Sequence, residues 1–181
     1  MKKIALVAGL AAAVAGTASA DVTVTFTNQT WTGFNFTDLS AAYGGFTGTL
    51  TGVSVNATLN ATTNFTYADD LCVYVDVAPL STGGLLQVGG FSNLQALQRL
   101  SWANGGSSAV GTTVIDSKSV NAISFSGTSA DATIWLGNGY GASGTSGTWT
   151  GSITLIGVNA VPAPGAIALV GLAGLAGRRR R

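Results

Sequence analysis

The chain of 181 residues contains no histidine and no glutamate, and its only cysteine is Cys72. Without histidine it has no imidazole base and no histidine-ligated metal. A single cysteine excludes an internal disulfide and a cysteine zinc site, so we expect Cys72 to be a small buried apolar side chain. Seven aspartates are the only side-chain carboxylates, and no serine occupies a Gly-x-Ser-x-Gly elbow. We predict a protein that is not an enzyme, with no catalytic residue, no metal site and no cofactor.

Charge is scarce and unevenly placed along the chain. Only 8% of the residues are charged, and six of the eight basic residues lie in the first three or last four positions. Between them, residues 21–161 hold all seven aspartates against Arg99 and Lys118, a net charge of −5. Binding to a nucleic-acid backbone needs clustered lysine and arginine. Nucleic acid is therefore excluded as a partner.

The first 20 residues are typical of a signal peptide. A positively charged start precedes an apolar run over residues 4–14, and a small-residue cleavage signature follows at Ala18, Ser19 and Ala20. We expect cleavage before Asp21, with the export translocase as a partner. A retained membrane helix is the alternative.

The last 21 residues, 161–181, combine three features. A proline-containing segment comes first, formed by Pro162, Ala163, Pro164 and Gly165. The apolar run over 166–177 would be about 18 Å long as a helix, short of the roughly 30 Å hydrocarbon core of a bilayer. The chain then closes on four basic residues that favour the cytoplasmic side: Arg178, Arg179, Arg180 and Arg181. We expect this hydrophobic helix to hold the chain in the inner membrane only transiently.

The order of these three parts resembles the PEP-CTERM sorting signal of exported bacterial proteins. Ala163 stands where the motif that names the family has glutamate, so this is a Val-Pro-Ala-Pro-Gly variant. The resemblance implies processing by an exosortase-type membrane enzyme. It also implies delivery to the cell surface or to an extracellular matrix. A simple C-terminal anchor is the alternative.

The segment between the two ends, 21–160, alternates apolar and hydroxyl residues with the period of two that is typical of β-strands. The alternation is clearest over 22–27, 53–60, 71–77, 123–126, 132–136 and 148–155. Glycine, serine and asparagine clusters separate these runs at 83–84, 89–90, 104–108 and 137–147. We predict an all-β fold, a single jelly-roll-like β-sandwich whose strands show hydroxyls to water. One short helix is predicted at 93–102.

A weaker likeness concerns the same segment. The runs 46–50, 53–59 and 67–71, and the sequence Gly-Thr-Trp-Thr-Gly over 147–151, are similar in order to the P/Homo B β-sandwich of proprotein convertases. The acidic turn that follows the Gly-Thr-Trp strand in that family is missing here. The resemblance implies a jelly-roll-like topology, and neither a protease partner nor a calcium site.

Two aromatic residues are the best candidates for contact with carbohydrate. Trp135 is out of phase with its apolar neighbours and so points away from the apolar face of its strand, and Tyr140 lies in a glycine-rich loop. The alternative is that these rings pack in the core or at its rim. The densest carboxylate group is Asp69, Asp70 and Asp76. It lacks Asp-x-Asp-x-Asp spacing, so we favour an acidic turn over a calcium site.

Five asparagines begin Asn-x-Thr patterns and are candidate glycosylation sites: Asn28, Asn35, Asn56, Asn60 and Asn64. Asparagine and threonine are also common on exposed strands and turns, and the bacterial type of export favours unmodified side chains.

Two functions follow from these observations. The first is a non-catalytic structural protein, exported and sorted to the cell surface or extracellular matrix. The second is a carbohydrate-binding or adhesion module of the envelope, with extracellular polysaccharide as its partner.

Overall fold

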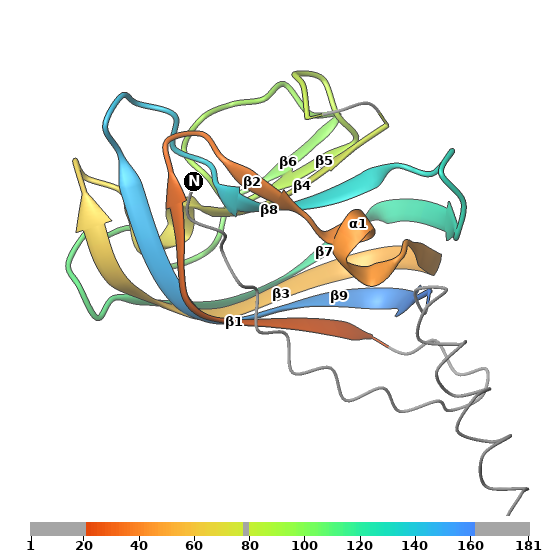
Figure 1. The fold of residues 1–181 in the computed structure, drawn as a ribbon, viewed down its shortest axis with the longest axis horizontal. Helices are drawn as coiled ribbons and strands as arrows, with labels where there is room; N and C mark the ends of the chain where they lie inside the picture. The colour runs from red at the N-terminus through yellow and green to blue at the C-terminus, as the bar shows by residue number, and fades with distance from the viewer. Residues whose placement is uncertain (1–20, 78–79, 162–181) are drawn as a thin grey trace, which may run out of the picture.

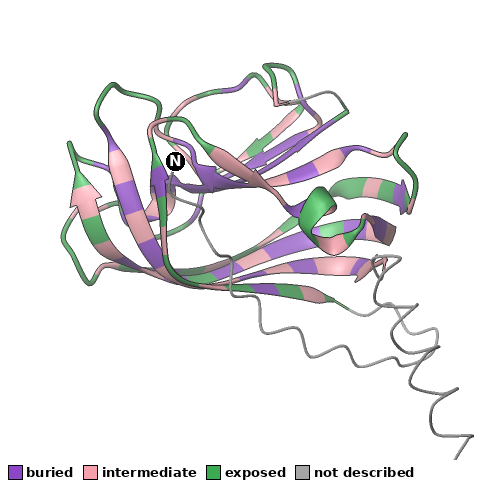
Figure 2. Cartoon of the chain, viewed as in Figure 1, coloured by how far each residue is buried: buried purple, intermediate pink, exposed green. Residues whose placement is uncertain are grey.

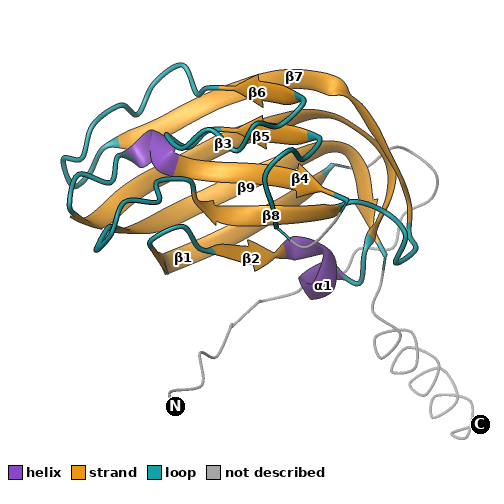
Figure 3. Cartoon of the chain, turned by 90° about the horizontal axis from the view of Figure 1, so that it is seen from above, coloured by secondary structure: helices purple, strands orange, loops and turns teal. Residues whose placement is uncertain are grey.

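The structure is a computed structural model and describes residues 21–77 and 80–161. The expected signal peptide and the sorting segment from Pro162 onward lie outside the described residues. Two β-sheets make up most of the described chain, which confirms the all-β prediction (Figures 1 and 3). Over the described ranges, no helix is long and apolar enough to span a membrane.

One sheet contains four long antiparallel strands in the order β1-β9-β3-β7. Their bounds are β1 (Val22–Thr32), β9 (Ser146–Ala160), β3 (Phe46–Thr63) and β7 (Thr113–Ser126). The other sheet has the order β2-β8-β4-β5-β6, antiparallel except for the parallel pair β5–β6. Its strands are β2 (Phe36–Asp38), β8 (Thr133–Asn138), β4 (Leu71–Asp76), β5 (Leu86–Val88) and β6 (Gln98–Leu100).

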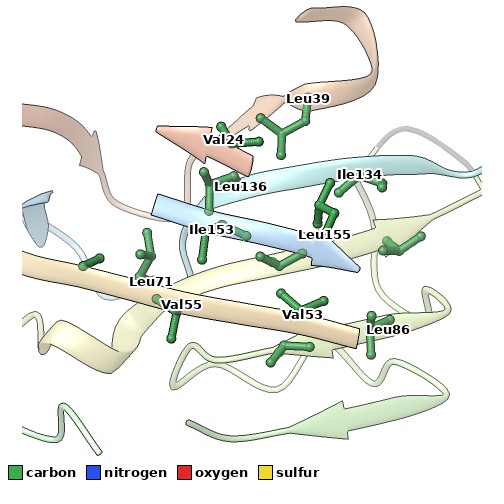
Figure 4. Close-up of a cluster of buried hydrophobic side chains, with 14 of the residues drawn as sticks. Val24, Leu39, Val53, Val55, Leu71, Leu86, Ile134, Leu136, Ile153 and Leu155 are labelled. Carbon is green, nitrogen blue, oxygen red and sulfur yellow. The ribbon is translucent and has the colours of Figure 1, made fainter. Parts of the chain in front are cut away.

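The main hydrophobic core lies between the two sheets. Val53 and Ile153 reach it from the four-stranded sheet, and Leu71 and Ile134 from the five-stranded sheet (Figure 4). All four side chains are buried. Because strand side chains alternate between faces, the apolar residue at every second position is enough to build this layer.

Hydroxyl groups cover the outer face of the four-stranded sheet, as the alternation predicts. Buried and exposed residues alternate along β1 and β3 (Figure 2). Neighbouring strands pair their hydroxyls, for example Thr23 with Thr154 (Oγ1–Oγ1 2.9 Å) and Thr30 with Thr148 (Oγ1–Oγ1 2.7 Å). Cross-strand threonine pairs of this kind add to sheet stability.

The five-stranded sheet departs from the expected pattern, because β4 is buried on both faces. Cys72 and Tyr74 point away from the main core but form a second buried cluster with Leu94. Leu80 and Ala96, which lie between β4 and β6, pack against this cluster and thus help to cover the face. The Tyr74 hydroxyl donates to the carbonyl of Ser81 (2.9 Å) and accepts from the N–H of Gly84 (2.7 Å), which holds the cover in place.

The helix predicted at 93–102 is wrong. That range contains β6, and its leucines do not share a face: Leu94 is buried, whereas Leu97 is 83% exposed. The buried amide of Gln87 explains the extended path, because its Oε1 accepts from the N–H of Leu94 (3.0 Å) and its Nε2 donates to the carbonyl of Ser92 (2.7 Å). These backbone groups are thereby satisfied without a helix.

The only α-helix in the described residues is α1 (Leu39–Tyr43), which the sequence analysis missed. Asp38 caps it by accepting from the N–H of Ala41 (2.8 Å), and Gly44 ends it with φ at 74°. A further difference concerns the loop expected at 137–147. β8 continues to Asn138 and β9 begins at Ser146, so the loop is 139–145.

Candidate ligand-binding site

Four connections meet at one end of the two-sheet body. They follow β1, β3, β5 and β8, and hydrogen bonds tie them to one another. Gly33 N donates to the carbonyl of Thr145 (2.7 Å), Asn64 Nδ2 to that of Gly144 (3.1 Å) and Ser92 N to that of Gly139 (2.8 Å). These connections form what we call the aromatic end, because they carry five rings that reach solvent: Phe34, Phe65, Tyr67, Phe91 and Tyr140.

Both termini of the described body leave from the opposite end. In the register of the four-stranded sheet, Val22 pairs with Leu155, close to the end of β9, whereas Thr32 pairs with Ser146 at its beginning. The Asp21 carboxylate accepts from the N–H of Gly157 (3.0 Å) near the end of β9. The aromatic end therefore points away from the two places where the expected targeting segments join the body (Figure 1).

A pocket of about 310 Å³ opens at the aromatic end. Its wall combines rings, charges and glycine turns. The charged and aromatic residues that line it are Tyr67, Asp69, Asp70, Phe91, Arg99 and Trp102. They come from the short 3₁₀ turn before β4, the turn after β5, and β6 with the residues that follow it.

Asp70 is buried beneath this pocket and holds two loops together. Its Oδ2 accepts from the N–H of Tyr67 (2.7 Å) and its Oδ1 from the N–H of Phe91 (3.1 Å). Burial raises the pKa of Asp70 to about 6, the charge of Asp69 raises it too, and the two backbone hydrogen bonds oppose the rise. The main effect of this carboxylate is to position the two rings of the pocket.

Phe91 is held rigidly but presents its ring to solvent. Besides the bond from its N–H to Asp70, its carbonyl accepts from Arg99 Nη2 (3.0 Å). The side chain is nevertheless 74% exposed. Tyr140 meets it edge-on, with ring centroids 5.6 Å apart and an interplanar angle of 82°. This T-shaped arrangement is a favourable one for aromatic pairs.

Asp69 differs from the other carboxylates of the chain. Six of the seven aspartates accept a hydrogen bond from the backbone N–H of another residue: Asp21, Asp38, Asp70, Asp76, Asp116 and Asp131. In residues 21–77 and 80–161, no such bond from another residue reaches the Asp69 carboxylate, which lies in the pocket wall. Burial raises its pKa. Its oxygens remain available to an incoming donor.

The two residues singled out for carbohydrate contact lie in different clusters. Tyr140 belongs to the aromatic end through its contact with Phe91. Trp135 lies on the covered outer face of the five-stranded sheet and packs against the cluster of Cys72, Tyr74 and Leu94. Its Nε1 is buried, without a hydrogen-bond partner in the described part of the chain. The structure therefore does not bring these two candidates together.

The remaining tryptophans are core residues. Trp31, Trp102 and Trp149 are at most 5% exposed. Trp102 Nε1 donates to the carbonyl of Leu71 (2.7 Å) and Trp149 Nε1 to that of Ala68 (3.1 Å). Cys72 is a free and fully buried thiol, as expected. Burial and the nearby charge of Asp70 raise the pKa of Cys72.

The three aspartates of the predicted acidic group are separated. Asp69 and Asp70 line the pocket, whereas Asp76 at the end of β4 accepts from both the N–H (3.0 Å) and the hydroxyl (2.7 Å) of Ser81. Among the described residues, no three histidine, cysteine or acidic side chains lie together as metal ligands would. A second cavity, of about 400 Å³, lies between α1 and the β7–β8 turn, and Asp131 in its wall already binds the N–H groups of that turn.

The five candidate glycosylation sites occupy two kinds of environment. Asn35 and Asn56 are exposed. Asn60 Nδ2 donates to Asn28 Oδ1 (2.8 Å) and Thr150 Oγ1 (2.7 Å), and Asn64 Nδ2 donates to Gly144. Asn28, Asn60 and Asn64 therefore take part in hydrogen bonds between strands or loops.

Comparison with protein-family models, with curated proteins and with solved structures finds no match to this chain.

Sequence reasoning missed Tyr67, Phe91 and Arg99 as site residues. Each carries a local signal. The two rings stand in polar or glycine-rich stretches, where no strand alternation explains them, and Arg99 is one of two cations in the acidic segment 21–161. Their convergence depends on the strand order, which these signals do not contain.

Proposed function

We propose that this protein is an exported, non-catalytic component of the cell surface or extracellular matrix, sorted through its C-terminal segment. The observation that carries the proposal is the order of the tail: the Pro-Ala-Pro segment at 162–164, the apolar run and the Arg178–Arg181 cluster, in a chain that begins with a signal-peptide pattern. An exosortase-type enzyme is the partner that this order implies.

The use of the carboxylates supports a structural role. General acid–base chemistry needs a carboxyl group that is free to exchange a proton with a substrate. Six of the seven aspartates instead brace backbone N–H groups of turns, caps and strand ends. The positions of these six aspartates are explained by their role in holding the fold together.

The strand order supports a jelly-roll assignment for the body, which we include in the proposal. Along the chain, β1, β3, β7 and β9 lie in one sheet while β2, β4, β5 and β8 lie in the other. Repeated crossing between two sheets is how two Greek keys wrap into a jelly roll, an architecture found in lectin and capsid domains. In this assignment β6 is an addition at the edge of the second sheet.

The sorting proposal is tested by replacing the four arginines Arg178–Arg181 with serine in the native host. The full chain should lose tail processing and accumulate with the membrane fraction, while its signal peptide is still removed. A matched variant, in which Lys118 alone becomes serine, should be sorted normally because Lys118 lies in β7, within the body and outside the pocket. Identical fractionation and identical mass of the arginine variant and the parent would contradict the proposal.

One observation favours the second candidate, a carbohydrate-binding or adhesion module. The aromatic end exposes rings on loops opposite to the end where the targeting segments join. A tail held at the membrane would leave this end facing outward. The two functions are compatible, because a sorted surface protein can also adhere.

A further inference from the structure

The pocket at the aromatic end has features that the fold alone does not require. Exposed apolar rings on loops contribute little to folding, yet Phe91 is clamped by Asp70 and Arg99 and braced by Tyr140 while 74% of its side chain stays in solvent. Rigid presentation of an apolar surface lowers the entropic cost of binding. Tyr67, 40% exposed, adds a second ring to the same pocket.

Polar groups accompany the rings. Within the described residues, no backbone N–H of another residue donates to the Asp69 carboxylate, which can therefore accept from hydroxyl donors. Arg99 uses Nη2 to hold the turn at 90–91, and a guanidinium has further N–H donors in the same plane. An acceptor and a donor beside apolar rings match a ligand that has hydroxyl groups along its edge and C–H groups on its face.

We propose that this pocket binds neutral sugar rings of a polysaccharide, with Phe91 and Tyr67 against the C–H face and Asp69 and Arg99 bonded to the hydroxyl edge. A neutral sugar fits better than an acidic one because Asp69 and the buried Asp70 outnumber Arg99. The body is also acidic as a whole, with seven aspartates against two cations over 21–161. This inference rests on the second proposed function and does not depend on sorting through the tail.

Binding is measured by calorimetry on the purified secreted protein. The probes are hexasaccharides of β-1,4-linked glucose, β-1,4-linked mannose and α-1,4-linked glucose, with a hexamer of galacturonic acid as the charged comparison. We expect saturable binding of at least one neutral hexasaccharide and weaker binding of the acidic hexamer. Binding of the acidic hexamer alone would overturn the neutral-sugar assignment and leave the adhesion function standing. Binding of none of the four would overturn both.

The chain offers a closely matched pair of variants. Phe91 and Phe65 are both 74% exposed at the aromatic end, but only Phe91 lines the pocket. Replacing Phe91 with alanine should weaken binding roughly tenfold or more, the loss expected for one aromatic contact. Phe65→Ala should bind as the parent does. Equal losses in the two variants, or no loss in Phe91→Ala, would contradict the proposal.

Two further variants separate the roles within the site. Asp69→Asn should weaken binding without lowering the melting temperature, because no backbone N–H of another residue depends on that carboxylate and its charge opposes that of Asp70. Tyr140 is a positioning residue, since it contacts Phe91 and does not line the pocket. Tyr140→Ala should weaken binding and Tyr140→Phe should restore it. Full affinity in both Asp69→Asn and Tyr140→Ala would refute these roles.

Discussion

At the scale of single residues, the aspartates accept many of the hydrogen bonds that hold the turns of this chain. The chain has few lysines, no histidine and a single cysteine, whose thiol is buried. Its turns are held by carboxylates that accept hydrogen bonds from backbone N–H groups. Asp131 is an example: its Oδ2 accepts from the N–H groups of Ser126 (2.7 Å), Gly127 (2.7 Å) and Thr128 (3.1 Å), which fixes the β7–β8 turn. Such charge-assisted bonds are stronger than neutral ones.

The raised pKa of Asp70 makes stability depend on pH. The folded protein holds this proton more tightly than the unfolded chain, whose carboxyl has a pKa of 3.8, so the free energy of unfolding falls as pH rises through about 6. From pH 5 to pH 8 we expect a loss of about 1.4 kcal/mol, the value of one pKa unit. Urea unfolding at the two pH values measures this difference.

The Asp70→Asn variant supplies the control, because asparagine does not titrate. It should be about as stable as the parent at pH 5, where the Asp70 carboxyl is mostly protonated and, like asparagine, has one full acceptor oxygen for the N–H groups of Tyr67 and Phe91. Its stability should also change less between pH 5 and pH 8. A parent whose stability is flat or rises over this interval would show that Asp70 does not hold its proton there.

At the scale of elements, the sequence predicts the strands well and their surroundings poorly. Alternation of apolar and polar residues identifies β1, β3, β4, β7, β8 and β9. A strand in a two-layer core needs an apolar residue only at every second position, because only one of its faces is buried. The same rule fails for the outer face of β4. Tyr74 and Cys72 are buried there in part by Leu80, Leu94 and Ala96, which follow β4 in the chain, and the alternation within β4 does not encode that cover.

The candidate site shows the same limit. Tyr140 was identified because an aromatic ring in a glycine-rich loop is conspicuous in the sequence. Phe91 was missed because its importance comes from Asp70 and Arg99, which lie 21 and 8 positions away in the chain. Trp135 looked exposed by alternation, yet the covering segment packs against it.

Two glycines with positive φ, one inside and one outside the turn after β5 that lines the pocket, test how tightly this turn is packed. Gly83 (φ 87°) and Gly89 (φ 76°) would both be strained by a side chain, at about 1 kcal/mol. A Cβ on Gly83 meets no atom within 4 Å, whereas a Cβ on Gly89 would lie 2.7 Å from Cδ1 of Trp102. Gly89→Ala should therefore be destabilised by about 2 kcal/mol more than Gly83→Ala, the cost of overpacking.

Chemical denaturation of the two variants beside the parent gives this difference directly. Equal destabilisation would mean that the turn after β5 can move away from Trp102. The rigid placement of Phe91 would then lose its support.

At the scale of the whole molecule, Trp149 links the four-stranded sheet to the turn that precedes β4. It is fully buried, and its Nε1 donates to the carbonyl of Ala68 (3.1 Å). Trp149→Ala should lower the free energy of unfolding by about 3–5 kcal/mol. Trp149→Phe keeps much of the ring but not the donor, and should cost about 1–3 kcal/mol. Thermal or urea unfolding distinguishes the two, and a Phe variant as unstable as the Ala variant would contradict the packing argument.

The two ends of the two-sheet body also differ from each other. The first and last described residues lie at one end of the four-stranded sheet and the aromatic end lies at the other. In the proposed function, attachment and recognition are therefore separated along the strands. This arrangement suits a protein that is held from one side and meets its surroundings with the other.

The central claim, that the chain is exported and sorted through its tail, is tested most directly by the intact mass of the protein recovered outside the cell. We expect a chain that begins at Asp21, ends near the 162–165 segment and lacks Arg178–Arg181. The same spectrum would show unmodified asparagines at all five Asn-x-Thr patterns. A chain recovered from the cytosol at its full mass, with residues 1–20 and the arginine cluster retained, would contradict the account.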